Sequence, residues 1–236
     1  MVVGEPDAAM HGAFSAEGPR EMWVRGVDFD VVADQTALGG HLLDVRTPNG
    51  VTDDIYLPLH GRHQGLNASC ALAAVEAFFD RAIETDLVQA AFASVTSPGR
   101  FEVMSHGPLV IIDGAHNPQG ALAAARTLEE EFDVAGRRVL VVGMLGGRDI
   151  VEMLEQFGVR SVDLVIACTP DSPRAVPASD IAEVCRAMGV LTEAIDDVAT
   201  AVSRAVAIST DEDAVLIAGS LYVAGAARTA LESLAL

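Results

Sequence analysis

The sequence predicts an α/β protein, mainly because short apolar runs alternate with amphipathic segments from about residue 97 to the end. The runs are rich in Val, Ile and Leu, as strands buried on both faces are. The predicted strand and helix pairs are 109–113 with 118–132, 138–143 with a helix from Asp149, 163–168 with 178–188, and 214–219 with a helix from Ser220, with a further helix over 197–208. This alternation predicts a mostly parallel, doubly wound sheet with helices on both faces.

Residues 1–96 have a different pattern, so we place a domain boundary at about residue 97. A short strand at the start and a helix over 7–16 precede an antiparallel ribbon within 21–59, where Pro48-Asn49-Gly50 is a strong hairpin signal. After a turn at 61–65, we expect a helix capped by Asn67 with an apolar stripe of Cys70, Ala71, Ala74, Val75 and Phe78, and then a helix over 87–95.

The segment from Thr96 to Gly120 contains the most informative junction between a strand and a helix. The apolar run at 109–112 ends at Asp113, and Asn117 followed by Pro118 is typical of a helix N-cap with proline at the first helical position. In an open parallel sheet, ligands bind where the carboxyl ends of strands meet the starts of helices. Residues 113–116 are therefore a candidate site.

Composition excludes several classes of protein. The net charge is -19 over 236 residues, which argues against a nucleic-acid-binding surface because phosphate backbones need clustered cations. All 15 basic residues are arginines, so the chain has no lysine. A Walker A loop, a Schiff-base lysine and a carbamylated lysine are therefore impossible within these residues.

The cysteines and the first residues suggest a cytoplasmic protein. Cys70, Cys168 and Cys185 have no CxxC spacing and lie in apolar or helical contexts, as reduced core cysteines do. The start lacks a basic segment followed by a long apolar one, and no run of 18 uncharged apolar residues occurs, so we expect neither a signal peptide nor a membrane partner.

Two glycine-rich phrases invite well-known interpretations that their spacing does not support. In residues 143–147 the glycines fall as G-x-x-G-G, which is not the dinucleotide fingerprint. Ser220 directly follows Gly219, so the phrase is not the nucleophile elbow of a serine hydrolase. At a strand end that opens a helix, the Ser220 hydroxyl either caps that helix or binds a ligand carboxylate, and capping is the simpler interpretation.

Other candidate residues have ordinary structural explanations when each is considered alone. Arg62 and His63 are typical of a turn. Arg100 alone is a surface arginine, Asp113 a strand-end cap, and His116 a histidine that bonds to a neighbouring loop. Their combination in this order carries the functional signal.

That combination resembles a known family. The phrases GRHQGLNASCALAA, SPGRFEV, VIIDGAHNPQGA, VVGMLGGRDI and VLIAGSLYVAG closely resemble, in this order, the C-terminal half of folylpolyglutamate synthase, which is often bifunctional with dihydrofolate synthase, in the Mur ligase superfamily. The resemblance runs from about Leu57 to Arg228 and implies a Rossmann-like C-terminal domain. Peptidoglycan Mur ligases share the histidine, asparagine and arginine features and are the nearer alternative.

The resemblance implies an ATP-dependent ligase of folate biosynthesis that works through an acyl phosphate. ATP and magnesium activate a folate or dihydropteroate carboxylate, which the amine of L-glutamate then attacks. By similarity, Asn67, Arg100 and Asp113 would contact the nucleotide, with Arg100 near its phosphates, and His116 and Ser220 would face the glutamate. Arg100 and His116 would be the catalytic residues, and no metal ligand is expected in this chain.

The sequence also departs from the family. The glycine-rich phosphate loop, the magnesium ligands and the modified lysine of the family would all precede Met1, so residues 1–96 are expected to be a remnant of the central ATPase domain and 97–236 the complete glutamate ligase domain. We therefore expect a fragment without ligase activity alone, completed by a phosphate-loop segment in cis or in trans. Arg148 stands where the family usually has lysine.

Two further expectations follow from the departure. A non-catalytic binding or regulatory protein that reuses the domain is the alternative from another functional class. The helix face from Cys70 to Phe78 should be exposed or repacked, because the sheet that it packs against in the family is not encoded here.

Overall fold

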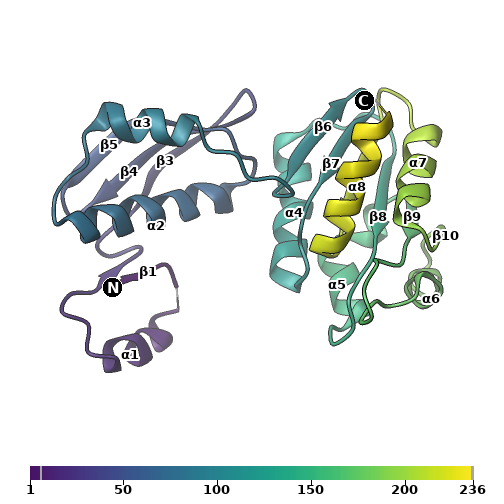
Figure 1. The fold of residues 1–236 in the computed structure, drawn as a ribbon, viewed down its shortest axis with the longest axis horizontal. Coiled ribbons are helices and arrows are strands. Elements are labelled where there is room, and N and C mark those ends of the chain that lie inside the picture. Colours follow the sequence, from purple (N-terminus) through teal and green to yellow (C-terminus); the bar gives the residue numbers. More distant parts are fainter. Residues whose placement is uncertain (6, 235–236) are drawn as a thin grey trace. The chain divides into compact units, whose positions relative to one another are not determined.

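A computed structural model describes residues 1–5 and 7–234 of the chain. The chain divides into two compact units, Met1–Thr96 and Ser97–Leu236 (Figure 1). Each unit has its own buried apolar clusters. The predicted class, a mostly parallel α/β sheet preceded by a small antiparallel ribbon, is confirmed. The assignment of the first unit to a family's ATPase domain stays a prediction.

The first unit contains a two-stranded parallel pair and a three-stranded antiparallel sheet. Its elements are β1 (Val2–Val3), α1 (Ala8–Ala16), β2 (Trp23–Val24), β3 (Asp30–Ala37), β4 (Gly40–Thr47), β5 (Gly50–Leu57), α2 (Arg62–Phe79) and α3 (Thr85–Ala93). β1 pairs with β2, and the antiparallel sheet has the order β3-β4-β5. Thr47 pairs with Gly50, so Pro48 and Asn49 form the predicted hairpin turn.

The helix α2 begins earlier than the sequence predicts, so the assignment of Asn67 as an N-cap is wrong. Gly61 precedes the first helical residue with a φ of 95°, a conformation that glycine adopts without strain. The predicted turn at 61–65 therefore joins the helix. Asn67 lies in the second turn of α2, exposed, and its side-chain amide donates to Gln64 Oε1 at 3.1 Å.

The predicted apolar stripe of α2 is also displaced from the face that the structure buries. The buried residues include Ala68, Leu72 and Ala73, which pack within the first unit. Val75 and Phe78 are exposed, Phe78 by 82%. The face from Cys70 to Phe78 was expected to be exposed or repacked, and it is exposed at Ala74, Val75 and Phe78, whereas Cys70 is half-buried and packs within the first unit. Helical spacing did not identify the inner face, because this helix presents apolar residues on both sides.

The second unit is built on a six-stranded sheet with the order β10-β9-β8-β11-β7-β6, in which only β6 runs antiparallel to its neighbour. Its elements are β6 (Glu102–His106), β7 (Leu109–Ile112), α4 (Pro118–Glu131), β8 (Arg138–Val142), α5 (Ile150–Gln156), the 3-10 turn η1 (Val159–Ser161), β9 (Leu164–Ala167), α6 (Ala178–Ala187), β10 (Thr192–Ala194), α7 (Val198–Ile208), β11 (Ala214–Ala218) and α8 (Leu221–Leu234). The sequence did not predict β6 or β10, which are the polar or very short edge strands.

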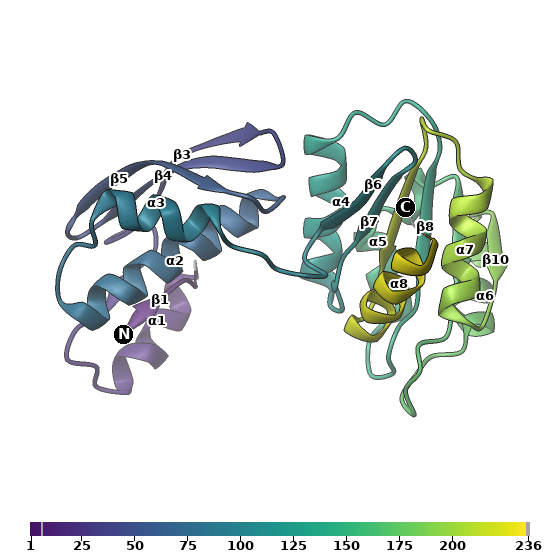
Figure 2. The same ribbon diagram turned by 45° about the horizontal axis from the view of Figure 1, so that its top comes forward.

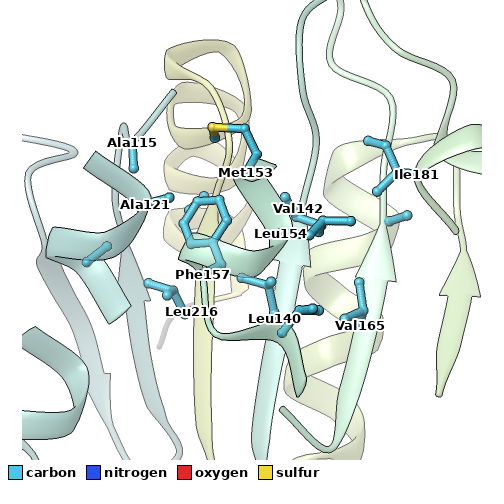
Figure 3. Close-up of a cluster of buried hydrophobic side chains, with 14 of the residues drawn as sticks. Ala115, Ala121, Leu140, Val142, Met153, Leu154, Phe157, Val165, Ile181 and Leu216 are labelled. Carbon is cyan, nitrogen blue, oxygen red and sulfur yellow. The ribbon is translucent and has the colours of Figure 1, made fainter. Parts of the chain in front are cut away.

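Helices cover both faces of this sheet, as predicted for a doubly wound fold. Figure 2 shows α4 and α7 on opposite sides of the strands. Leu140 and Val142 of β8 face the cluster with α4, α5 and α6, which includes Met153, Leu154 and Phe157 (Figure 3). The alternate residues of the same strands face α7 and α8. Side chains therefore fill both faces, which leaves the strand ends for ligands.

Three local features complete the description. Asn117 Oδ1 accepts a hydrogen bond from Gly120 N–H at 2.7 Å, which confirms the predicted N-cap of α4. Cys70, Cys168 and Cys185 are free, and burial raises the pKa of the Cys168 thiol to about 12. Among the described residues, no helix combines the length and apolar character that crossing a membrane requires.

Candidate ligand site at the carboxyl ends of the strands

A cavity of about 470 Å³ lies in the second unit, where the loops after β7, β8, β9 and β11 meet. The lining residues are His116, Met144, Leu145, Gly146, Gly147, Arg148, Met153, Arg174, Gly219, Ser220, Leu221 and Tyr222. The helix after β8 covers one face of the sheet and the helix after β11 covers the other. Ligands in open α/β sheets bind at such a reversal, so the cavity has the expected place for a site.

The cavity is cationic in a strongly acidic protein. Two arginines, Arg148 and Arg174, line it, and its lining contains no aspartate or glutamate. Asp149 follows Arg148 in sequence, but its carboxylate caps α5 by accepting hydrogen bonds from the N–H groups of Val151 and Glu152. The charge of the lining therefore favours an anionic ligand.

Ser220 caps the helix α8, which confirms the simpler of its two interpretations. Its Oγ accepts a hydrogen bond from Val223 N–H at 3.2 Å, and its carbonyl oxygen accepts one from Ala224 N–H at 3.0 Å. The side chain is buried yet lines the cavity. Because the hydroxyl accepts in the cap, its O–H proton can still be donated to a ligand.

His116 is an exposed residue at the edge of the cavity, in the loop between β7 and α4. Its Nδ1 lies 2.9 Å from the carbonyl oxygen of Gly114, in agreement with the neighbouring-loop interpretation. A carbonyl oxygen can only accept, so Nδ1 carries the proton. In the neutral ring, Nε2 therefore has the lone pair that can accept a proton.

Asp113 is 7% exposed, and backbone groups occupy both of its carboxylate oxygens. Oδ2 accepts from Phe101 N–H at 2.8 Å and Oδ1 from Ala115 N–H at 2.7 Å, so it is a strand-end cap. Burial raises the pKa of this carboxyl, while the two hydrogen bonds and the charges of Arg100 and His116 oppose the rise. Asp113 does not line the cavity.

Arg100 lies on an exposed turn beside the loop that carries His116. Its N–H donates to Ser97 O at 3.0 Å, and Gly114 N–H donates to Gly99 O at 2.7 Å. The second bond connects the turn to the end of β7. Arg100 is not part of the cavity lining, so any ligand that it binds extends beyond that cavity.

The five predicted site residues do not all belong to one unit. Arg100, Asp113, His116 and Ser220 lie in the unit Ser97–Leu236, whereas Asn67 lies on α2 in the unit Met1–Thr96. Of the four in the second unit, His116 and Ser220 line the cavity.

Sequence reasoning missed Arg174 and Tyr222, and it did not assign Arg148 to a ligand. The segment that contains Arg174 has Pro173 and Pro177 and is typical of an ordinary loop. Its position after the predicted strand at 163–168 was the available signal, because loops after parallel strands share one edge of the sheet. Strand order decides which of these loops meet, and strand order is not visible in the sequence.

The second unit matches the model of the glutamate ligase domain of Mur ligases over residues 99–221, more than half of the chain. The chain belongs to the Mur ligase family. The fold and the resemblance to folylpolyglutamate synthase are thereby confirmed. Within residues 1–5 and 7–234, no group of three or more His, Cys, Asp or Glu side chains comes together to bind a metal.

Individual relatives are similar over most of this chain. The dihydrofolate synthase/folylpolyglutamate synthase of Mycobacterium tuberculosis is 41% identical over 86% of this chain and 45% of its own length. A structure of M. tuberculosis folylpolyglutamate synthase complexed with ADP has a TM-score of 0.91, 36% identity and coverage of 98% and 54% of the two chains. Escherichia coli FolC in complex with DHPP and ADP has a TM-score of 0.84, 26% identity and coverage of 100% and 53%. This chain spans about half the length of these relatives.

Proposed function

We propose that this chain supplies the glutamate-binding part of an ATP-dependent ligase that adds glutamate to a folate or dihydropteroate. The observation that carries the proposal is the cationic cavity, where Arg148, Arg174 and the Ser220 hydroxyl suit an amino-acid dicarboxylate. The identity to the M. tuberculosis relative supports the folate class over a peptidoglycan ligase.

The cavity residues have complementary tasks in this proposal. The arginines bind the carboxylates of glutamate, and the Ser220 O–H donates to one of them. His116 Nε2 accepts a proton from the glutamate ammonium, so that the free amine attacks the activated carboxyl carbon and an amide bond forms. Phosphate leaves from that carbon, and Arg100 stabilises its charge.

ATP supplies the phosphoryl group that activates the substrate carboxylate, but these residues fit only part of an ATP site. The chain has no lysine and hence no Walker A loop, and no cluster of metal ligands occurs among the described residues. Asn67 and Arg100 remain proposed nucleotide contacts. The two backbone bonds of Asp113 support a positioning role instead, and its contact with nucleotide stays a prediction.

Magnetic resonance tests the glutamate site directly. We expect L-glutamate, added to the ¹⁵N-labelled chain, to shift the amide signals of Gly146, Gly147, Leu221 and Tyr222, which line the cavity. Shifts restricted to residues outside the lining, or no saturable shifts, would contradict the proposal.

A second assay addresses catalysis and the contrasting non-catalytic function. The purified chain, incubated with ATP, magnesium, a reduced folate and glutamate, should form no glutamylated folate because it has no lysine for a phosphate loop. Addition of a lysine-containing phosphate-loop polypeptide that restores product would support the ligase. Product from the chain alone would refute the expected inactivity, whereas glutamate binding without restoration would favour the non-catalytic alternative.

A further inference from the structure

The turn between β4 and β5 places an asparagine directly before a glycine, Asn49-Gly50, and both residues are exposed. The side-chain amide of such an asparagine is open to attack by the next backbone nitrogen, because glycine has no Cβ to hinder the approach. A Cβ atom on Gly50 would meet nothing within 4 Å, so the surroundings do not hinder it either. The other two asparagines are less open. Asn67 lies within α2 and precedes an alanine, and Asn117 precedes a proline, which has no N–H.

In the folded chain, a buried carboxylate of α2 holds the side-chain amide of Asn49. Asn49 Nδ2 donates a hydrogen bond to Glu76 Oε2 at 3.0 Å, and the same oxygen accepts one from the Thr47 hydroxyl at 2.6 Å. The N–H of Asn49 donates to Thr47 Oγ1 at 3.2 Å, and Glu76 is 2% exposed. These bonds fix the backbone and the side chain of an exposed residue. The amide nitrogen that hydrolysis of Asn49 would release is therefore the atom that Glu76 binds.

We propose that Asn49 is a site of deamidation and that Glu76 suppresses the reaction in the folded chain. The backbone nitrogen of Gly50 gives its proton to water and attacks Cγ of Asn49, so that a C–N bond closes a succinimide ring while Nδ2 leaves as ammonia. Water then opens the ring at one of its two carbonyl carbons and yields aspartate or isoaspartate. Overall, one water is consumed and one ammonia is released, and no other reactant takes part.

The product would reverse the contact that joins the hairpin turn to α2. A carboxylate at position 49 would face Glu76 where an amide donor now lies 3.0 Å from it, and two carboxylates that share a site repel each other. Isoaspartate would also lengthen the backbone between Thr47 and Gly50, which are paired across the two strands. Deamidation would therefore loosen the first unit by turning a stabilising hydrogen bond into a repulsion.

The test follows the conversion of amide to acid at each asparagine by mass spectrometry of peptides from the aged full chain. The samples are the folded wild type, the wild type in urea, and the folded variants E76A, E76Q and V88A. Val88 is 3% exposed and packs in the apolar cluster of the first unit, so V88A lowers stability without removing an acceptor from Asn49. The fluorescence of Trp23 reports whether each variant is folded, and E76Q serves if E76A does not fold.

We expect Asn49 to convert in urea while Asn67 and Asn117 do not, and to convert about tenfold or more slowly in the folded wild type, because reaction then requires local opening. E76A should raise the rate in the folded chain about fivefold or more, and V88A should change it by less than about twofold. No conversion of Asn49 in urea refutes the modification site. Equal rates in E76A and V88A, or equal rates in the folded and unfolded wild type, overturn the protective role of Glu76.

The consequence of deamidation has its own measurement. N49D reproduces the aspartate product, and N49A removes the same hydrogen bond without adding a charge. We expect N49D to unfold at a lower urea concentration than N49A, and the two to coincide in the E76Q background, where the opposing charge is absent. A midpoint of N49D equal to that of N49A in the wild-type background would overturn the proposed repulsion with Glu76.

Discussion

The carboxylate of Asp113 accepts a hydrogen bond from Phe101 N–H at 2.8 Å and thereby fastens the turn that carries Arg100 to the end of β7. Phe101 has a φ of 46°, a left-handed conformation that a phenylalanine adopts only when its surroundings fix it. Its ring is buried and packs against Phe132 with centroids 5.8 Å apart. Asp113 therefore holds a strained turn in the conformation that presents Arg100.

Replacement of Asp113 by alanine should destabilise the second unit. The N–H groups of Phe101 and Ala115 lose their acceptors, and a buried unsatisfied donor costs about 1 to 3 kcal/mol. We expect D113A to lower the free energy of unfolding by about 2 kcal/mol or more in urea denaturation. D133A, at an exposed aspartate, is the control and should stay within about 0.5 kcal/mol of wild type. Equal stabilities of D113A and D133A would show that the two hydrogen bonds of the Asp113 carboxylate do not stabilise the second unit.

The alternation of strands and helices predicted the second unit well because its strands are buried on both faces. Each such strand has to be almost wholly apolar, so its run is visible in the sequence. β6 and β10 escaped prediction because edge strands have less buried surface and tolerate polar residues such as Glu102 and Ser105. Regular local patterns therefore reveal the interior of the sheet better than its edges.

The candidate site was predictable only in part, for a related reason. His116 and Asp113 adjoin a well-marked strand end and helix start, which local signals locate. Arg174 becomes a cavity residue only through pairing between two loops about 30 residues apart, and this pairing leaves no periodic trace. The start of α2 was misplaced for a third reason, because the glycine at position 61 was interpreted as part of a longer turn.

Gly219 at the edge of the cavity should not tolerate a side chain. Its φ is 108°, and a Cβ atom would lie 2.6 Å from the backbone oxygen of Gly143. We expect G219A to lower the free energy of unfolding by about 2 kcal/mol or more, because backbone atoms have to move. G225A in α8 is the matched control, since a Cβ atom there meets nothing within 4 Å. The control should raise stability by about 0.5 to 1 kcal/mol, as glycine to alanine does in a helix. A G219A variant as stable as the wild type would show that the backbone after β8 and β11 can move apart to accommodate a methyl group.

Glu76 is a buried carboxylate that organises the first unit. It accepts hydrogen bonds from the Thr47 hydroxyl at 2.6 Å, the Asn49 amide at 3.0 Å and Ile83 N–H at 3.1 Å, so it connects α2 to the hairpin turn and to the loop before α3. E76A should cost about 1 to 3 kcal/mol, because the buried Thr47 hydroxyl and two less buried donors lose their acceptor. The single tryptophan, Trp23, lies in this unit and reports its unfolding by fluorescence.

The control and the contrary outcome for Glu76 use the same fluorescence signal. E17A removes an exposed carboxylate from the first unit and should change its unfolding midpoint little. In a double-mutant cycle, T47A should cost less in the E76A background than in wild type, because the two residues share a hydrogen bond. Additive effects of the two substitutions would mean that this bond does not stabilise the unit.

Asp213 should make the stability of the second unit depend on acid pH. Burial by itself raises the pKa of this carboxyl, but hydrogen bonds from Thr210 N–H and from the side chain and N–H of Arg137 outweigh it and lower the pKa to about 2. The unfolded chain, with an ordinary aspartate pKa near 3.8, takes up its proton first as pH falls. The stabilisation is therefore complete above about pH 5 and is lost between about pH 4 and pH 2.

A comparison of wild type with D213N isolates this contribution. The difference in the free energy of unfolding should approach about 2 kcal/mol near neutral pH and shrink toward pH 2, since a pKa difference of one unit corresponds to about 1.4 kcal/mol. R137Q removes the guanidinium but keeps the backbone N–H bond to Asp213 at 2.6 Å, so its pH dependence should fall between those of wild type and D213N. A difference between wild type and D213N that stays constant from pH 6 to pH 2 would exclude a lowered pKa and leave Asp213 with a role in packing alone.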